Sequence, residues 1–161
     1  MSKAQTVPTT AVDPTVAAAA SQFLSPIVLG LEALTVNGKQ AHWHVRGANF
    51  VGVHELLDTI VAHAGDFADT AAERIVALGL PIDARIETVA AKAGTTAVPA
   101  GFAQSDELIR AVISDIDTIL ADVKAAIDGL DEVDLTSQDV AIEIMRGLEK
   151  DRWFLVSHIA A

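Results

Sequence analysis

One stretch, residues 51–78, constrains the fold of this chain more than any other part of the sequence. It contains no proline, is rich in alanine and leucine, and is followed by Gly79-Leu80-Pro81. Glycine and proline after a run of good helix formers indicate where a helix ends. We therefore expect a single long helix over these residues.

Four possible metal ligands lie along this predicted helix: His54, Asp58, Asp69 and Glu73. At about 100° of rotation per residue, all four fall within roughly 100° of one another and share one face. Asp58 and Asp69 are nevertheless separated by roughly 16 Å along the helix axis, at about 1.5 Å per residue, so they cannot bind the same ion. The helix therefore carries two half-sites.

The two half-sites are placed symmetrically about the point between His63 and Ala64. A second, antiparallel copy of the helix, related by a two-fold axis at that point, would bring each half-site opposite the other half-site of the partner. Ala62 and Gly65 lie on the same face and are small enough to let two helices approach closely. We infer two identical sites, each shared between subunits. The alternative is a solvated polar stripe whose spacing arises by chance.

Composition and charge limit the kinds of ligand and partner. The chain has 161 residues, enough for one domain with a hydrophobic core. Its formal net charge of -11 opposes nonspecific binding to nucleic acid or to an anionic membrane, and favours the attraction of cations. Because cysteine is absent, a metal site must use nitrogen and oxygen ligands, which suit iron, manganese or zinc.

The N-terminal segment differs from the rest of the chain. Residues 1–13 are predicted to form a mobile tail, and residues 14–161 a single domain. The tail carries one lysine, Lys3, which is too little positive charge for binding DNA through its phosphates. The apolar stretch 16–36 is interrupted by proline and glycine and has almost no basic segment before it, so we expect no targeting signal and a cytoplasmic protein.

Apolar spacing and capping residues predict helices before and after the long one. A first helix should follow Asp13-Pro14 and extend to about Val45, with Pro26 expected to kink or restart it. A short helix is expected near residues 86–92, inside the long connection 82–98.

Two further helices complete the predicted fold. Ser105 should cap one that ends at Gly129, and Thr136 should cap the last, while residues 94–101 form a loop. The sequence has no strand pattern and no internal repeat. Four long helices with one long connection after the second predict an all-α four-helix bundle with a short extra helix in that connection.

A third candidate ligand comes from the first helix. His42 lies twelve residues before His54, and a short turn between antiparallel helices could bring both to one end of the bundle. The complete set would contain two histidines and three carboxylates. Such a set could hold one or two divalent ions and leave positions open for substrate.

These residues resemble the Dps family, the DNA-binding proteins of starved cells, also called mini-ferritins. The matching segments are Lys39-Gln40-Ala41-His42-Trp43, Arg46-Gly47-Ala48-Asn49-Phe50, His54-Glu55, Leu57-Asp58, Asp69, Ala72-Glu73-Arg74 and Leu78-Gly79. Eleven residues separate His42 from His54, three separate His54 from Asp58, ten separate Asp58 from Asp69, and three separate Asp69 from Glu73. This spacing is highly specific. Helix order extends the likeness over about residues 14–160.

The resemblance implies a ferritin-like bundle assembled into a hollow homododecamer of two-fold dimers, with a ferroxidase site at each dimer interface. Fe(II) would be oxidised there, preferably by hydrogen peroxide, and stored inside as ferric mineral, which would protect DNA and the cell from oxidative damage. The implied ligands are His42, His54 and Asp58 from one subunit and Asp69 and Glu73 from the other, with Trp43 beside the site.

The other histidines are interpreted separately. His44 stands where the family more usually has asparagine. It points about 200° away from His42 on a helix, which favours a surface residue or a hydrogen-bond donor behind the site over an extra ligand. His63 lies off the ligand face and is interpreted as an interface or core residue, and His158 as a structural or exposed one.

A second acidic set lies at the predicted start of the last helix: Asp134, Asp139 and Glu143. Similar residues line the three-fold pores of the family, and rings of carboxylates attract cations. We interpret this set as the path of iron into the shell. A capped and solvated helix start is the alternative.

Two other functions are compatible with parts of the sequence. A metal-dependent amide or ester hydrolase could use the same histidines and carboxylates, since paired metals activate water, although no separate nucleophile supports it. A DNA-compacting structural protein is the other alternative. The formal net charge of -11 opposes DNA compaction, so we expect weak or absent DNA binding and no membrane partner.

Overall fold

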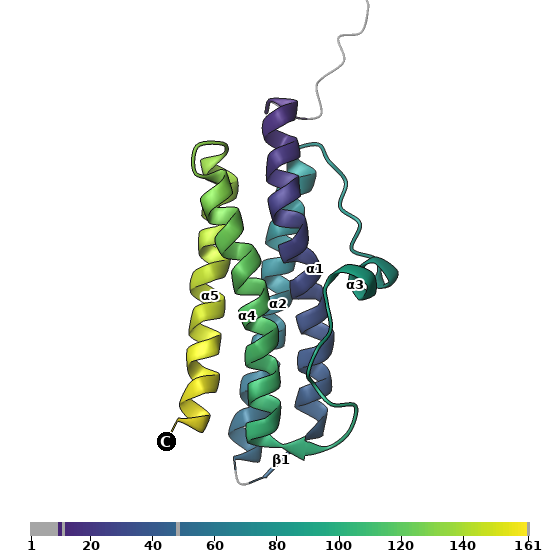
Figure 1. Cartoon of the computed structure of the whole chain (residues 1–161), viewed down its shortest axis with the longest axis vertical. Coiled ribbons are helices and arrows are strands. Elements are labelled where there is room, and N and C mark those ends of the chain that lie inside the picture. Colours follow the sequence, from purple (N-terminus) through teal and green to yellow (C-terminus); the bar gives the residue numbers. More distant parts are fainter. Residues whose placement is uncertain (1–9, 11, 48, 161) are drawn as a thin grey trace, which may run out of the picture.

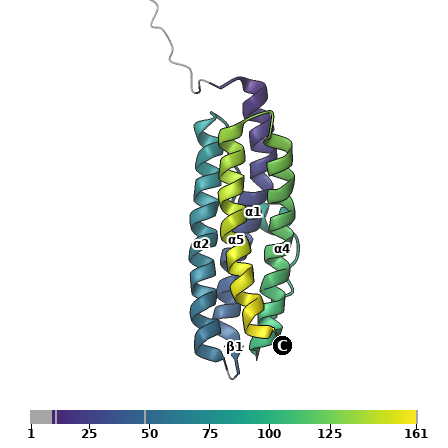
Figure 2. The same cartoon turned by 90° about the vertical axis from the view of Figure 1, so that its left-hand side faces the viewer.

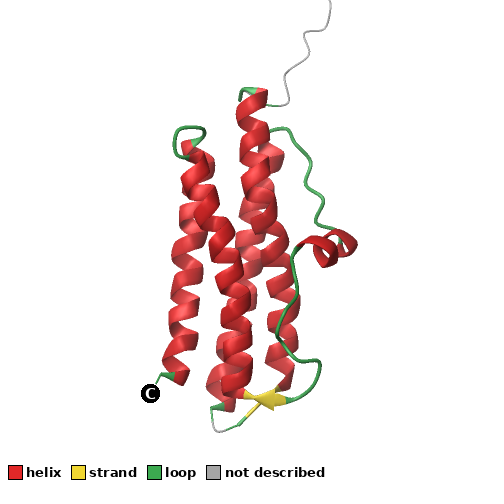
Figure 3. Ribbon diagram, viewed as in Figure 1, coloured by secondary structure: helices red, strands yellow, loops and turns green. Residues whose placement is uncertain are grey.

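The structure, a computed structural model, describes residues 10, 12–47 and 49–160. Most of the expected mobile tail, residues 1–13, lies outside these residues. The described elements, coloured by type in Figure 3, are α1 (Pro14–His44), β1 (Val45–Arg46), α2 (Phe50–Ala77), α3 (Ile86–Lys92), β2 (Ala103–Gln104), α4 (Ser105–Leu130) and α5 (Leu135–Ile159).

The four long helices run side by side along the molecule (Figures 1 and 2). α1 packs against α2 and α4, and α5 packs against the same two helices, so α1 and α5 occupy opposite corners of the bundle. The short helix α3 lies beside α1 in the long connection between α2 and α4. The predicted all-α bundle with its extra helix is confirmed.

Apolar side chains at helical spacing form the core between the helices. The largest fully buried ones within the four long helices are Leu24, Ile27, Leu31, Leu34, Leu57, Ile60, Ile75, Leu108, Ile109, Ile116 and Leu130. By length and apolar composition alone, α1 could cross a membrane. Its apolar side chains pack into this shared core against α2 and α4.

The first helix is continuous at Pro26, so of the two predicted alternatives, a kink or a restart, the restart does not occur. α1 begins as predicted, with the Asp13 carboxylate accepting a hydrogen bond from the Thr15 amide at 2.8 Å. The helix does not restart at Pro26 but continues through it to His44. Leu24 and Ile27, on either side of the proline, are fully buried, and their packing outweighs the backbone hydrogen bond that proline cannot make.

Two predicted helix boundaries differ slightly from the structure. α4 ends at Leu130, one residue beyond Gly129, and the missing side chain of Gly129 makes room for Phe23 of α1. A Cβ atom at Gly129 would lie 2.2 Å from the Phe23 ring. The last helix begins at Leu135 with Asp134 as its N-cap, two residues before the expected Thr136.

A short parallel strand pair, absent from the sequence prediction, ties the long connection to the end of α1. Val45 in β1 lies opposite Ala103 in β2. Two-residue strands are too short to produce an alternating pattern, which explains why they were not predicted. The Arg46 guanidinium also lies 3.5 Å above the Phe102 ring. Ser105, the expected cap of α4, is instead the first residue of that helix.

Candidate metal centre

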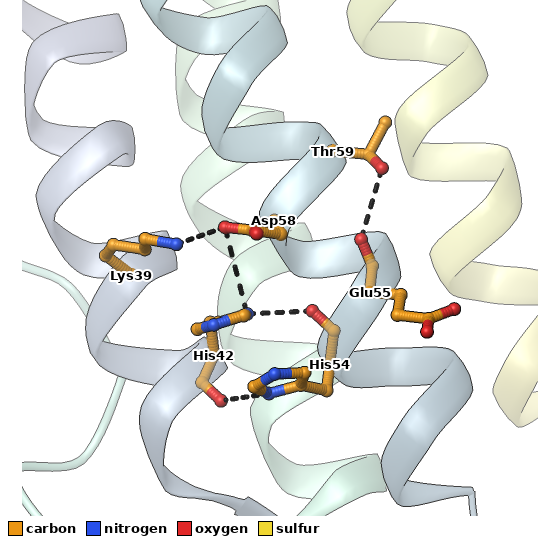
Figure 4. Close-up of polar contacts among 6 residues, drawn as sticks. All are labelled: Lys39, His42, His54, Glu55, Asp58 and Thr59. Atoms are coloured by element: carbon orange, nitrogen blue, oxygen red, sulfur yellow. Dashed lines mark hydrogen bonds and ion pairs between the residues drawn. The ribbon is translucent and has the colours of Figure 1, made fainter.

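Two histidines meet where α1 ends and α2 begins. The His42 Nδ1 lies 2.8 Å from the His54 carbonyl oxygen, and the His54 Nδ1 lies 2.9 Å from the His42 carbonyl oxygen. The two imidazole rings are stacked, with their centroids 3.7 Å apart, and Figure 4 shows the polar contacts of both residues. Because a carbonyl oxygen only accepts, each Nδ1 must donate its proton, which leaves both Nε2 atoms with free lone pairs.

Asp58, one turn after His54, supplies a carboxylate beside this pair. Its Oδ1 lies 4.0 Å from the His42 Nδ1 and forms an ion pair with the Lys39 ammonium (Figure 4). Lys39 lowers the pKa of the Asp58 carboxyl. The carboxylate is therefore ionised near neutral pH, and Lys39 competes with a metal ion for its charge.

Burial differs between the histidines and the carboxylate. His42 is 7% exposed, held in place by the packing of α1 on α2. The Asp58 side chain is 53% exposed. The arrangement is a pair of nitrogen donors beside an accessible carboxylate, open to solvent rather than closed within the chain.

The other two predicted ligands, Asp69 and Glu73, lie further along α2 and are exposed. In the part of the chain that the structure describes, no three histidine or carboxylate side chains are close enough to hold one ion. Between the half-sites, Ala62 is exposed and Gly65 is partly exposed. The chain's own helices therefore leave this face of α2 uncovered, and completion of the site by a partner stays a prediction.

Trp43, His44 and His158 are further ring-bearing residues for which the sequence suggested a role. Trp43 is 63% exposed near the end of α1, and its place beside the metal site stays a prediction. The His44 Nδ1 lies 2.8 Å from the Gln40 carbonyl oxygen within α1. The His44 ring lies against Phe102 in the loop before β2. His158 is exposed. Neither His44 nor His158 contributes to the half-site formed by His42, His54 and Asp58.

His63 has a partner that sequence reasoning did not identify. Its Nδ1 lies 3.0 Å from both carboxylate oxygens of Asp151 on α5, and Asp151 is only 1% exposed. Burial raises the pKa of the Asp151 carboxyl, and the contact with His63 opposes that change. The two residues are 88 positions apart, so no local pattern could have paired them. His63 is thus a partly buried link between α2 and α5.

Lys39 was also missed as a residue of the site. It lies three positions before His42, and a helix brings residues three apart to neighbouring positions. The three-residue separation of Lys39 and His42 could therefore have identified Lys39 as a neighbour of the site.

The predicted pore residues have different environments. Asp139 and Glu143 are exposed on α5. Asp134 instead accepts hydrogen bonds from the Arg74 guanidinium at 2.7 Å and from the Ser137 hydroxyl at 2.5 Å. Its charge is therefore compensated within the chain, where it joins the end of α2 to the start of α5. The role of the three residues in iron passage stays a prediction.

The pH dependence of stability should reveal the Asp134 contact. Burial acts to raise the pKa of Asp134, but the hydrogen bonds from Ser137 and Arg74 outweigh it, and the pKa is lowered. A carboxyl with a lowered pKa stabilises the fold above its ordinary pKa and loses that contribution as pH falls through the folded value. Asp134→Asn should thus cost about 1–2 kcal/mol near neutral pH.

Urea unfolding of wild type and Asp134→Asn at neutral pH and at successively lower pH measures this effect. The difference between the two proteins should shrink as the wild-type carboxyl becomes protonated. Asp139→Asn, on the exposed side of the same helix, is the matched control and should change little at any pH. A constant Asp134→Asn deficit down to the lowest pH would contradict the assigned cause.

Comparison with known proteins agrees with the fold and with the sequence pattern. A ferritin-like domain model matches residues 32–161. The chain is 34% identical to the DNA protection during starvation protein of Agrobacterium fabrum over 75% of both chains. It is 70% identical to the Dps of Microbacterium arborescens, solved in a high iron form, with a TM-score of 0.92 over 94% of this chain and 99% of that one.

The chain belongs to the Dps family. The Mycobacterium smegmatis Dps gives a TM-score of 0.88 at 26% identity, over 98% of this chain and 96% of that one, so the Dps fold is maintained at much lower identity. The family resemblance inferred from the histidine and carboxylate spacing is confirmed. Iron storage and protection of DNA are the general roles that membership of the Dps family implies.

Proposed function

We propose that this Dps-family chain is a ferroxidase and iron-storage protein. It oxidises Fe(II), preferably with hydrogen peroxide, at sites shared across a two-fold dimer interface, and stores the ferric product as mineral inside a hollow dodecamer. The observation that carries the proposal is the pair His42 and His54, whose Nδ1 atoms are held by backbone carbonyl oxygens next to the ionised Asp58.

The donor set suits iron chemistry. Imidazole nitrogen binds Fe(II), and carboxylate oxygen favours the Fe(III) that forms. Two Fe(II) ions at one site can each give one electron to the O–O bond of peroxide. With two protons, this yields two Fe(III) ions and two water molecules. The reaction avoids the one-electron cleavage of peroxide that would release hydroxyl radical.

The partner subunit would complete each site. Asp69 and Glu73 are exposed on the same face of α2, and the symmetric spacing of the half-sites supports an antiparallel pairing of two α2 helices. Under this proposal, each dimer has two equivalent sites. Asp134, Asp139 and Glu143 are proposed to lie along the route by which iron reaches the interior.

Protection of DNA would follow from the chemistry rather than from binding. The chain carries a formal net charge of -11, which opposes association with phosphate at physiological salt. We propose a cytoplasmic location, where Fe(II) and peroxide both threaten DNA, and weak or absent DNA binding by the shell.

The function is tested by loading iron-free protein with Fe(II) under anaerobic conditions and then adding hydrogen peroxide. Ferric absorbance should rise much faster than in protein-free buffer, and the ferric product should stay soluble and co-elute with the assembled shell in size-exclusion chromatography. An intact shell that oxidises iron no faster than buffer would contradict the proposal. Precipitation of ferric oxide outside the shell would contradict its storage part.

A further inference from the structure

A groove on the opposite side of the bundle from the α2–α5 contact is not used by the iron site. It has a volume of about 360 Å³ and lies between α1, α4 and the connection that follows α3, which Figure 1 shows running alongside α1. The residues that line its long walls are Pro26, Gly30, Ala33, Leu34 and Asn37 on α1, and Asp115, Thr118, Ile119 and Asp122 on α4.

One end of the groove has a half-buried carboxylate. The Asp115 Oδ2 accepts a hydrogen bond from the Thr96 hydroxyl at 2.6 Å, and Asn37 lines the groove as well. These neutral groups leave the charge of the carboxylate uncompensated. Burial raises the pKa of the Asp115 carboxyl even so, which is the effect expected when a carboxylate is partly desolvated without a cation beside it.

The other end has a second carboxylate, and the middle of the groove is apolar. Asp122 lies two turns beyond Asp115 on the same face of α4 and is exposed at the rim of the groove, where partial desolvation raises its pKa as well. Between them, the Ile119 side chain packs against Gly30, where a Cβ atom would lie 2.9 Å from it. Gly30 and Ile119 thus form an apolar floor of the groove between the two carboxylates.

Neither carboxylate has a cationic partner in the described part of the chain. Every described ion pair involves other carboxylates, among them Asp58, Asp134 and Asp151. Lys92 lines the groove and is exposed, yet it forms no ion pair with Asp115 or Asp122 among the described residues. The groove therefore presents two separated negative charges joined by an apolar wall.

The distance between the two carboxylates limits the length of the ligand. Seven residues of α4 separate the carboxylates by about 10.5 Å along the helix axis. Two ammonium groups, each about 2.8 Å from its carboxylate, would then be roughly 5 Å apart. An extended chain of three or four carbons between two amines spans about 5–6 Å, because each staggered bond of about 1.5 Å advances about 1.25 Å along the chain.

We propose that this groove binds a linear aliphatic diamine, with one ammonium group on Asp115 and Asn37, the other on Asp122, and the methylene chain over Gly30 and Ile119. Charge complementarity at both ends, together with the apolar middle, distinguishes this ligand from a divalent metal ion. A metal ion would need several oxygen ligands around one point, whereas the two carboxylates lie two helical turns apart.

Calorimetric titration of the iron-free, assembled protein with 1,4-diaminobutane at physiological salt tests the proposal. One diamine should bind per subunit. Butylamine, which has a single charge, should bind at least about tenfold more weakly, as expected when one charged hydrogen bond is lost. Asp115→Asn and Asp122→Asn should each weaken diamine binding about tenfold. Both variants should keep the wild-type unfolding midpoint to within a few degrees.

The acidic surface could attract any polycation, so the control must remove the same charge elsewhere. Asp106→Asn changes an exposed carboxylate in the first turn of α4, outside the groove, and should leave the affinity within about twofold. Three outcomes would overturn the proposal: no saturable diamine binding, equal affinity for butylamine, or equal losses in Asp106→Asn and the groove variants. Equal losses in all the variants would mean that the diamine is attracted only by the overall negative charge of the surface.

Discussion

Co-expression of Asp58→Asn and Glu73→Gln subunits should restore about one quarter of the wild-type rate of peroxide-driven iron oxidation. Each variant alone should lose at least about tenfold in rate, because each lacks a carboxylate ligand. Recovery from two inactive proteins would be the direct sign that the site is shared. Size-exclusion chromatography would verify that each protein forms the same assembly.

The quarter follows from the symmetry of the dimer. In a mixed dimer, both lesions fall in one of the two sites, and the other site receives an intact half from each subunit. Random pairing makes about half of the dimers mixed, and half of the sites in those dimers are intact. A site made wholly within one subunit would show no recovery at all.

The matched control combines two lesions in the same half-site. Asp58→Asn mixed with His54→Ala should show no recovery, because every site then receives one damaged half. Glu55→Gln is the single-variant control, since Figure 4 shows its carboxylate directed away from His42, and it should retain the wild-type rate. Recovery in the Asp58→Asn and His54→Ala mixture would contradict the assignment of both residues to one half-site.

Leu57→Ala should destabilise the protein by about 3 kcal/mol, within the usual range of about 2–5 kcal/mol for truncation of a buried leucine. Leu57 is fully buried in the core, adjacent in sequence to Asp58. The cost combines the lost transfer free energy of the side chain with the cavity that remains. Val36→Ala, at a position 69% exposed on α1, should change stability by less than about 0.5 kcal/mol.

Chemical unfolding of the iron-free proteins, followed by far-ultraviolet circular dichroism, measures both effects. All samples must be compared at one protein concentration, because unfolding of an oligomer is coupled to dissociation. A Leu57→Ala midpoint equal to that of wild type would contradict the assignment of Leu57 to the core. A large loss in Val36→Ala would show that α1 is covered at that position in the assembly.

Local rules predicted much of the structure from the sequence. The short helix α3 spans the residues predicted for it, and α2 differs from its prediction by one residue at each end. The convergence of His42 with His54 was also expected, because a short turn between antiparallel helices leaves little freedom in how their ends meet. These features depend on neighbouring residues, which a periodic pattern reports reliably.

Other features depend on residues distant in sequence and were missed. Phe23 packs into the space left by the missing side chain of Gly129, more than a hundred positions later. The strand pair joins Val45 to Ala103 across the long connection, and Asp151 reaches His63 from α5. No local pattern encodes such contacts.

The sequence by itself determined the family, the bundle of long helices and the residues of the candidate metal site, because helical periodicity translates spacing directly into shared faces. Only the tertiary structure decided how those residues are held: the Nδ1 atoms of both histidines bound to backbone, Asp58 paired with Lys39, and Asp134 neutralised by Arg74. Charges and hydrogen bonds are compensated by whichever groups folding brings near, and that depends on packing between helices.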